Sequence, residues 1–136
     1  MPAFNWEAYL KNIKDVQSRL KVSELIVAEM EGRLVGTVTL FLKASGSSRE
    51  EWPEGWASVR LLAVHPDYRR RGIGRALMEE CIRRARKAGI RTIGLHTSKL
   101  MDAARRMYEM MGFKRAPELD IHPAPGVVIM AYRLDL

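Results

Sequence analysis

The segment from residue 60 to residue 75 constrains the fold of this chain more than any other part of its sequence. An apolar run over Leu61–Val64 stops at Pro66, a basic turn with two glycines follows, and an amphipathic pattern begins near Ile73. This order predicts a strand, a loop and a helix. Glycines let a ligand approach the backbone closely, and the first amides of a helix have no internal hydrogen-bond partner. The segment therefore predicts a binding site for a phosphate or pyrophosphate group.

Positive charge is concentrated on the same part of the chain. The 136 residues carry a formal net charge of +7, and residues 60–91 hold ten Lys and Arg against three Asp and Glu, which leaves thirteen of each sign elsewhere. This excess favours attraction of a polyanionic ligand. A solvated basic helix face is the structural alternative, and nucleic-acid binding is a third. No helix-turn-helix, zinc spacing or basic strand rich in aromatic residues supports nucleic-acid binding.

Composition and length predict one domain over residues 1–136, because 47% of the residues are hydrophobic and suffice for a core. A single cysteine excludes an internal disulfide framework, and Cys81 falls on the apolar stripe of its helix, as a core residue would. No apolar run approaches bilayer length and no signal peptide is visible, so we expect no membrane association and a cytoplasmic location. The three histidines lack metal-ligand spacing, so no metal is expected.

The hydrophobic periodicity predicts a mixed α/β order of elements. A strand–helix–strand unit implies a parallel pair with a right-handed crossover, and a preceding hairpin implies antiparallel pairing. The expected elements are a helix over 5–20, strands over 22–30 and 33–42, a loop over 43–55, a strand over 56–64, a helix over 73–88, a strand over 91–97, a helix capped by Ser98 and ended by Gly112, a short strand over 113–115, a proline-broken loop over 116–126 and a last strand over 127–134.

Two motifs resemble those of the GNAT superfamily of N-acetyltransferases. The run Arg69-Arg70-Arg71-Gly72-Ile73-Gly74 is similar to the acyl-CoA signature R/Q-x-x-G-x-G/A of that family. The family's A-x-x-L-Y-x-x-x-G-F helix is matched by Ala104, Met107, Tyr108, Gly112 and Phe113. The resemblance covers about residues 22–134 and implies the GNAT fold, a central mixed sheet whose parallel strands splay apart. The usual first strand is expected to be absent, which leaves an open edge or a wider acceptor cleft. A homodimer is expected to cover this surface.

The resemblance implies that acetyl-CoA is the cosubstrate. Backbone groups of Leu62, Ala63 and Val64 would pair with the pantetheine arm. The phosphates would lie against Arg69, Arg70, Arg71, Gly72, Ile73, Gly74 and Arg75. Met101 and Ala104 complete the expected cofactor contacts along the next helix. Because Met101 stands where relatives often have Asn, any contact through that amide is expected to be absent.

The implied reaction is direct attack of a primary amine, small or peptidic, on acetyl-CoA in a ternary complex. Tyr108 would act as general acid to the thiolate, although a tyrosine packed at the core edge would fit the same pattern. Relatives often have a glutamate where this chain has Ser58, so the base stays open among Glu51, Glu54 and Asp120, with Glu118, His96 and His122 as further alternatives.

Trp52 and Trp56 would either contact the substrate or cover the core edge. An acyl-CoA-binding sensor with little catalysis is the alternative function that Ser58 makes conceivable. A basic nucleic-acid binder is the third hypothesis.

Overall fold

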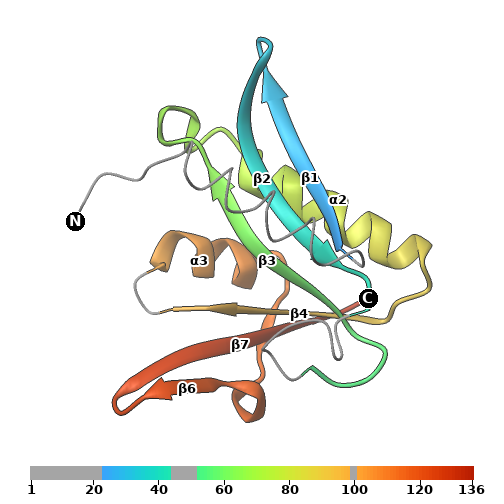
Figure 1. Cartoon of the computed structure of the whole chain (residues 1–136), viewed down its shortest axis with the longest axis vertical. Helices are drawn as coiled ribbons and strands as arrows, with labels where there is room; N and C mark the ends of the chain where they lie inside the picture. The colour runs from blue at the N-terminus through green and yellow to red at the C-terminus, as the bar shows by residue number, and fades with distance from the viewer. Residues whose placement is uncertain (1–22, 44–51, 99–100) are drawn as a thin grey trace.

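The computed structural model describes residues 23–43, 52–98 and 101–136 (Figure 1). Within these residues, seven strands form a mixed sheet in the order β1-β2-β3-β4-β7-β5, and β6 pairs with β7 off this path. The elements are β1 (Ser23–Met30), β2 (Arg33–Phe41), β3 (Ala57–Val64), the 3-10 turn η1 (Pro66–Tyr68), α2 (Ile73–Lys87), β4 (Thr92–Thr97), α3 (Asp102–Met110), β5 (Lys114–Arg115), η2 (Pro117–Leu119), β6 (Ile121–Ala124) and β7 (Val127–Asp135). The mixed α/β class is confirmed. The expected helix over 5–20 and residues 44–51 of the expected loop lie outside the described residues.

The first hairpin forms where the sequence predicts it. β1 and β2 pair antiparallel, and Glu31 and Gly32 both have positive φ angles, of 54° and 74°. Two successive positive φ values suit a tight turn whose twist matches that of the flanking strands. Figure 1 shows this hairpin projecting at one end of the sheet.

Helices α2 and α3 lie on the sheet and meet each other at the beginning of α2. α2 packs against β1, β2 and β3, and its buried residues are Ile73, Leu77, Met78, Cys81 and Ala85. A Cβ placed on Gly74 would lie 3.6 Å from the sulfur of Met107 in α3, which places the two helices side by side there. The expected helical stripe is therefore confirmed for α2, and Gly89, with a φ of 78°, follows the residue that caps its C-terminus.

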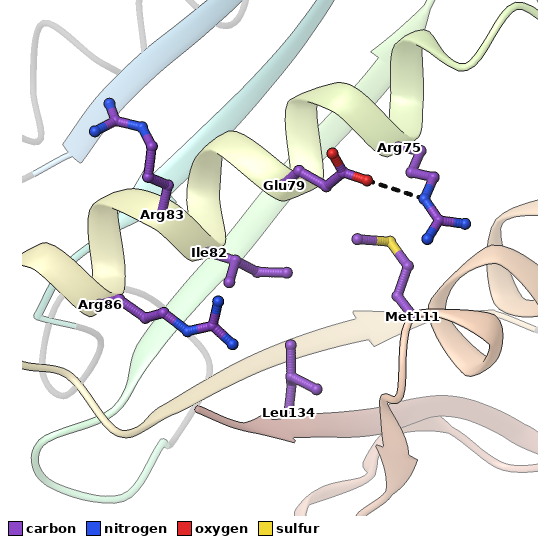
Figure 2. Close-up of a pocket in the computed structure, with 7 residues that line it drawn as sticks. All are labelled: Arg75, Glu79, Ile82, Arg83, Arg86, Met111 and Leu134. Atoms are coloured by element: carbon purple, nitrogen blue, oxygen red, sulfur yellow. Dashed lines mark hydrogen bonds and ion pairs between the residues drawn. The ribbon is translucent and has the colours of Figure 1, made fainter.

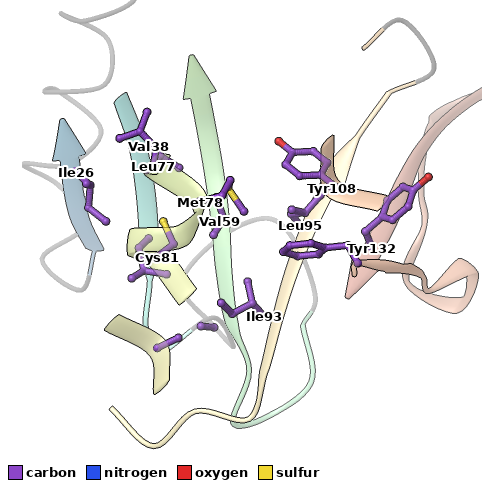
Figure 3. Packing of buried hydrophobic residues seen from close by; sticks show 14 of the residues in the cluster. Ile26, Val38, Val59, Leu77, Met78, Cys81, Ile93, Leu95, Tyr108 and Tyr132 are labelled. Atoms are coloured by element: carbon purple, nitrogen blue, oxygen red, sulfur yellow. The ribbon is translucent and has the colours of Figure 1, made fainter. Parts of the chain in front are cut away.

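The core lies between the helices and the sheet (Figure 3). Val38, Val59, Ile93 and Leu95 come from adjacent strands and contribute to a cluster that includes Cys81 of α2. Cys81 is fully buried, and this burial raises the pKa of its thiol to about 12. The thiol is therefore protonated at neutral pH, which confirms the expectation of a core residue.

Two expectations for the second half of the chain were wrong. α3 begins at Asp102 with Met101 as its N-cap, so Ser98 does not cap this helix. The segment 116–126 is not a plain loop, since it contains η2 and β6. Pro123 is compatible with β6 because this strand pairs with β7 and needs no backbone donor on its other edge.

Candidate active site

The parallel strands β3 and β4 diverge within the sheet. Their register includes only three pairs, from Ala57–Ile93 to Val59–Leu95, although β3 continues to Val64 and β4 to Thr97. Ala63 and Val64 still pair with β2 on their other side. Among the described residues, no strand therefore pairs with Leu62, Ala63 and Val64 on the side of β4, and an extended ligand can hydrogen-bond there as an added strand would.

A β-bulge lies at the start of this divergence. Thr37 and Thr39 of β2 face Ala63 and Arg60, so two residues of β3 stand opposite Val38 alone. Leu61 has a φ of 59°, in the left-handed region that is costly for a side chain other than glycine. Bulges bend a strand and redirect its backbone groups next to active sites. The sequence did not indicate the bulge at Leu61, because its residues read as an ordinary apolar strand.

The segment after β3 turns back sharply and ends at the first residue of α2. η1 is closed by a bond from the N–H of Tyr68 to the carbonyl of His65 at 2.9 Å, and Arg70 and Gly72 have φ angles of 65° and 78°. Gly72 is the N-cap of α2, and no side chain caps this end of the helix. The first amides of α2 are therefore not bound by a capping side chain and can donate to an anion.

The arginines of this segment divide into two groups. Arg69, Arg70 and Arg71 are exposed and have no salt-bridge partner within the described part of the chain. Arg75 instead donates from Nε to Glu79 at 3.0 Å along α2. The free positive charge is thus concentrated on residues 69–71, just before the N-terminus of α2.

Tyr108 is buried in α3 and packs against the sheet. Only 5% of its surface is exposed, and its ring lies 5.7 Å from that of Phe113. Figure 3 shows the ring beside Leu95, the last residue of β4 that pairs with β3, with its hydroxyl turned away from Leu95 and Tyr132. A phenol is therefore placed beside the point where the two strands part.

The other positions expected to contact the cofactor lie on β3 and at the start of α3. Leu62, Ala63 and Val64 are half-buried on β3, and Ala104 is half-buried in α3. Met101, the residue before α3, is 48% exposed. A Cβ on Gly74 would lie 3.6 Å from both Val64 of β3 and Met107 of α3. The structure thus brings β3, α3 and residues 69–74, which we call the glycine segment, to one region.

The carboxylates expected as bases have different surroundings. Asp120 accepts two hydrogen bonds from Arg115, both at 2.7 Å, and one from the N–H of Ala131. The hydrogen bonds from Arg115 are the main cause that lowers the pKa of this carboxyl to about 2, so Asp120 would be a weak base. Glu54 is exposed in the turn before β3, and Glu51 lies outside the described residues.

Ser58, at the position where the resemblance implies a glutamate in relatives, has a buried hydroxyl. Ser58 is 1% exposed, and its side-chain oxygen has no hydrogen-bond partner in the part of the chain that is described. His96, another alternative, lies 2.9 Å from the carbonyl of Leu119 through Nε2. A carbonyl can only accept, so Nε2 carries the proton and anchors the ring to η2. His122, on β6, and Glu118, in η2, are exposed.

Both tryptophans lie in a stack of rings on the sheet. The ring of Trp52 lies 4.4 Å from that of His96 and 5.8 Å from that of Trp56, and the guanidinium of Arg133 lies 4.6 Å from the ring of Trp56. Trp52 is 5% exposed and covers Gly94. Trp52 therefore belongs to a small core cluster, while Trp56 is half-buried at its edge.

A surface hollow lies beside α2, away from the divergence of β3 and β4 (Figure 2). It has a volume of about 370 Å³ and lies between α2, Met111 and Leu134, with arginines 75, 83 and 86 around it. Ile82, Met111 and Leu134 form its apolar part. Arg75 is the one residue shared between this hollow and the expected phosphate site.

Two general expectations concern metals and membranes. No group of three His, Cys, Asp or Glu side chains that could hold a metal ion is found among residues 23–43, 52–98 and 101–136. Over the same ranges, no helix has the length and apolar character needed to cross a bilayer. Location in the cytoplasm and assembly as a homodimer stay predictions.

Comparison with known families gives a match over most of this chain. The family model described as "Acetyltransferase (GNAT) family" matches residues 3–113. Camello from Xenopus tropicalis, named as a probable N-acetyltransferase, is 28% identical over 134 residues, which cover 93% of this chain and 58% of camello. The bS18-alanine N-acetyltransferase of Escherichia coli K12 is 44% identical over 60 residues, which cover 44% of this chain and 40% of that protein. The chain thus spans about half the length of these relatives.

Solved structures show the same fold. The ribosomal-protein-S18-alanine N-acetyltransferase of Escherichia coli superposes with a TM-score of 0.69 at 24% identity, over 98% of this chain and 79% of that one. The PaiA N-acetyltransferase of Thermoplasma acidophilum, solved in complex with coenzyme A, superposes with a TM-score of 0.67 at 21% identity, over 96% of this chain and 70% of that one.

Proposed function

Since the chain belongs to the GNAT family of acetyltransferases, we propose that it transfers an acetyl group from acetyl-CoA to a primary amine. The observation that carries the proposal is the divergence of β3 and β4 next to the segment that ends at the start of α2. An acyl-CoA has an extended amide-containing arm and a diphosphate. The open edge of β3 suits the arm, and the amides at the start of α2 suit the diphosphate.

The binding roles follow from this placement. Leu62, Ala63 and Val64 would pair with the pantetheine amides through their backbone. Gly72, Ile73 and Gly74 would present backbone N–H groups to the diphosphate, with the exposed guanidiniums at positions 69, 70 and 71 around it. Arg75 would contribute less, because Glu79 already binds it. Met101 and Ala104 would line the side formed by α3.

The chemistry requires an acid on the thiol side of the site. The amine nitrogen forms a bond to the thioester carbonyl carbon, the carbon–sulfur bond breaks, and the products are an amide and a thiol. The oxyanion formed on the way would be stabilised by a backbone N–H of β3. The Tyr108 hydroxyl would donate the proton that the leaving sulfur needs, and its place beside Leu95 at the opening supports this role.

A base must remove a proton from the attacking amine. Glu54 and Glu51, which lie before β3, are the proposed candidates, because the pKa of Asp120 is lowered to about 2 by its bonds to Arg115. The Ser58 hydroxyl is a much weaker base than a carboxylate. Trp56, at the edge of the ring stack, is the tryptophan with surface left to contact an acceptor.

The names of the relatives suggest which classes of acceptor to test. One relative is named for acetylating an alanine of a ribosomal protein, so protein N-termini join small amines among the acceptors to test. A sensor that binds acyl-CoA with little turnover is the second candidate function, and the buried Ser58 at the position of the usual glutamate favours it. Neither reading requires nucleic acid.

The test is thiol release from acetyl-CoA with a panel of polyamines, amino acids, arylalkylamines, aminoglycosides and peptides with free N-termini. An acetyltransferase should release thiol with one acceptor class above the rate of hydrolysis without acceptor. Replacing Glu51 and Glu54 separately by Gln would then test the base. Tight binding of coenzyme A with no release across the panel would contradict the enzyme and favour the sensor.

A further inference from the structure

The side chain of Arg33 adds a positive charge next to the glycine segment, although Arg33 comes from a distant part of the chain. Arg33, the first residue of β2, reaches the ring of Tyr68 in η1, with its guanidinium carbon 5.9 Å from the ring centre. The guanidinium carbon of Arg71 lies 5.1 Å from the same centre. The two guanidiniums are therefore at most about 11 Å apart. Tyr68 holds both of them through cation–π contacts.

The contacts of Arg33 do not neutralise its charge. Its Nη2 lies 3.0 Å from Nε2 of His65, and Nδ1 of the same ring lies 3.1 Å from the backbone nitrogen of Asp67. A guanidinium can only donate, so Nε2 of a neutral imidazole is the acceptor in this contact. An uncharged acceptor leaves the positive charge of Arg33 in place.

Acidic side chains do not neutralise the group either. Within the described ranges, neither Arg33 nor Arg71 forms a salt bridge, and both side chains are exposed. Asp67 lies on the same turn, but its carboxylate is directed to His65 at 3.9 Å. Two guanidiniums thus lie against one ring without a carboxylate partner in the described part of the chain, and Arg71 directly precedes the residue that caps α2.

We propose that Arg33, which shares the ring of Tyr68 with Arg71, binds a phosphate monoester next to the diphosphate bound at the start of α2. A guanidinium binds phosphate oxygens through two parallel N–H donors, and a phosphate monoester has almost two negative charges at neutral pH. Coenzyme A carries such a group at the 3′ position of its ribose, in addition to its diphosphate. This inference rests on the proposed function, and it adds that Arg33 selects coenzyme A over its 3′-dephospho form.

The experiment compares two ligands that differ only in this phosphate. Binding of coenzyme A and of dephospho-coenzyme A to the full chain is measured by calorimetry for the unchanged protein, for Arg33→Gln and for Arg86→Gln. Arg86 is the matched control, because it is an exposed arginine on the far part of α2 with no salt bridge among the described residues. Thermal unfolding of each variant checks that folding is retained.

The unchanged protein should bind coenzyme A about tenfold or more tightly than the dephospho form. Arg33→Gln should reduce this ratio severalfold through weaker binding of coenzyme A alone, and Arg86→Gln should leave the ratio unchanged. An equal loss for both ligands in Arg33→Gln, or an unchanged ratio, would overturn the inference.

Two further outcomes separate this inference from the proposed function. If the unchanged protein binds both ligands equally well, the proposed function stands and the phosphate site fails. If it binds neither ligand, the proposed function itself fails. Competition by inorganic phosphate at low concentration, without discrimination between the two ligands, would indicate a site for free phosphate and would also overturn the assignment to the coenzyme.

Discussion

Tyr108 combines a buried ring with a hydroxyl that can donate a proton. Its ring contributes to the core beside Phe113, and any aromatic residue could supply that packing. Its hydroxyl is the part that phenylalanine lacks. A Tyr108→Phe substitution therefore separates the two contributions with little change in volume.

We expect Tyr108→Phe to lower turnover by about 10²-fold or more while binding of coenzyme A changes little, because general acids contribute at this scale. Steady-state rates with the best acceptor and calorimetry with coenzyme A measure the two quantities. Parallel loss of turnover and of affinity would show that the hydroxyl acts in binding and not in proton transfer.

The ion pair between Asp120 and Arg115 should make the free energy of unfolding depend on pH. Arg115 is the main cause that lowers the pKa of Asp120 from 3.8 to about 2, so the folded state binds this proton less readily than the unfolded chain. The resulting stabilisation is present above about pH 4 and is lost as the pH falls from about 4 to about 2. We expect Asp120→Asn to reduce the free energy of unfolding on the order of 1 kcal/mol at pH 7, and by less near pH 3.

Urea unfolding at the two pH values measures this difference. Asp102→Asn serves as the control, because Asp102 pairs with Arg105 on the exposed surface of α3 and such pairs contribute little. A cost of Asp120→Asn that is as large at pH 3 as at pH 7 would contradict the assignment to this ion pair.

At the scale of secondary-structure elements, the contact between β4 and Trp52 limits the size of the side chain at position 94. A Cβ on Gly94 would lie 2.5 to 2.8 Å from three ring atoms of Trp52. The ring cannot move away freely, since His96 and Trp56 pack against it. Glycine at this position is therefore required by close approach and not by backbone conformation.

Gly94→Ala should destabilise the protein by about 1–3 kcal/mol, the usual cost of overpacking a core. Gly74→Ala is the comparison, because the nearest atoms lie 3.6 Å from its Cβ and no steric cost is expected. Denaturant unfolding of both variants provides the measurement. Equal stability of the two variants would mean that Trp52 relaxes without cost.

The whole molecule has an uneven charge that should affect how it meets its cosubstrate. Of the net charge of +7, the excess lies on residues 60–91, which include the glycine segment and α2. Arg33 adds to it from the hairpin. Such a field raises the rate at which a polyanion associates, and salt screens it.

We expect the association rate of coenzyme A, measured by stopped-flow fluorescence, to fall severalfold between 50 and 500 mM NaCl, with a smaller change in the dissociation rate. Repeating the series with potassium chloride controls for specific ion effects. An association rate that does not respond to salt would show that the charge excess does not steer the ligand.

Much of this architecture could be predicted from the sequence because its signals are local. The apolar run that stops at Pro66 predicted β3, the glycine after the arginines predicted the start of α2, and the turn Glu31–Gly32 predicted the first hairpin. The same local signals failed where pairing decides the structure. β6 forms because β7 offers it an edge, and α3 has Met101 as its N-cap although serine is the residue type that more often caps a helix.

The arrangement of the candidate site was decided by the tertiary structure. The sequence by itself determined the glycine segment, the charge around it and the tyrosine of α3, since each is encoded within a few neighbouring residues. It contained no sign that Leu61 forms a bulge, that Arg115 forms an ion pair with Asp120, or that the guanidinium of Arg33 contacts the ring of Tyr68. These features depend on strands that meet only when the sheet is assembled, and side chains distant in sequence become neighbours only then.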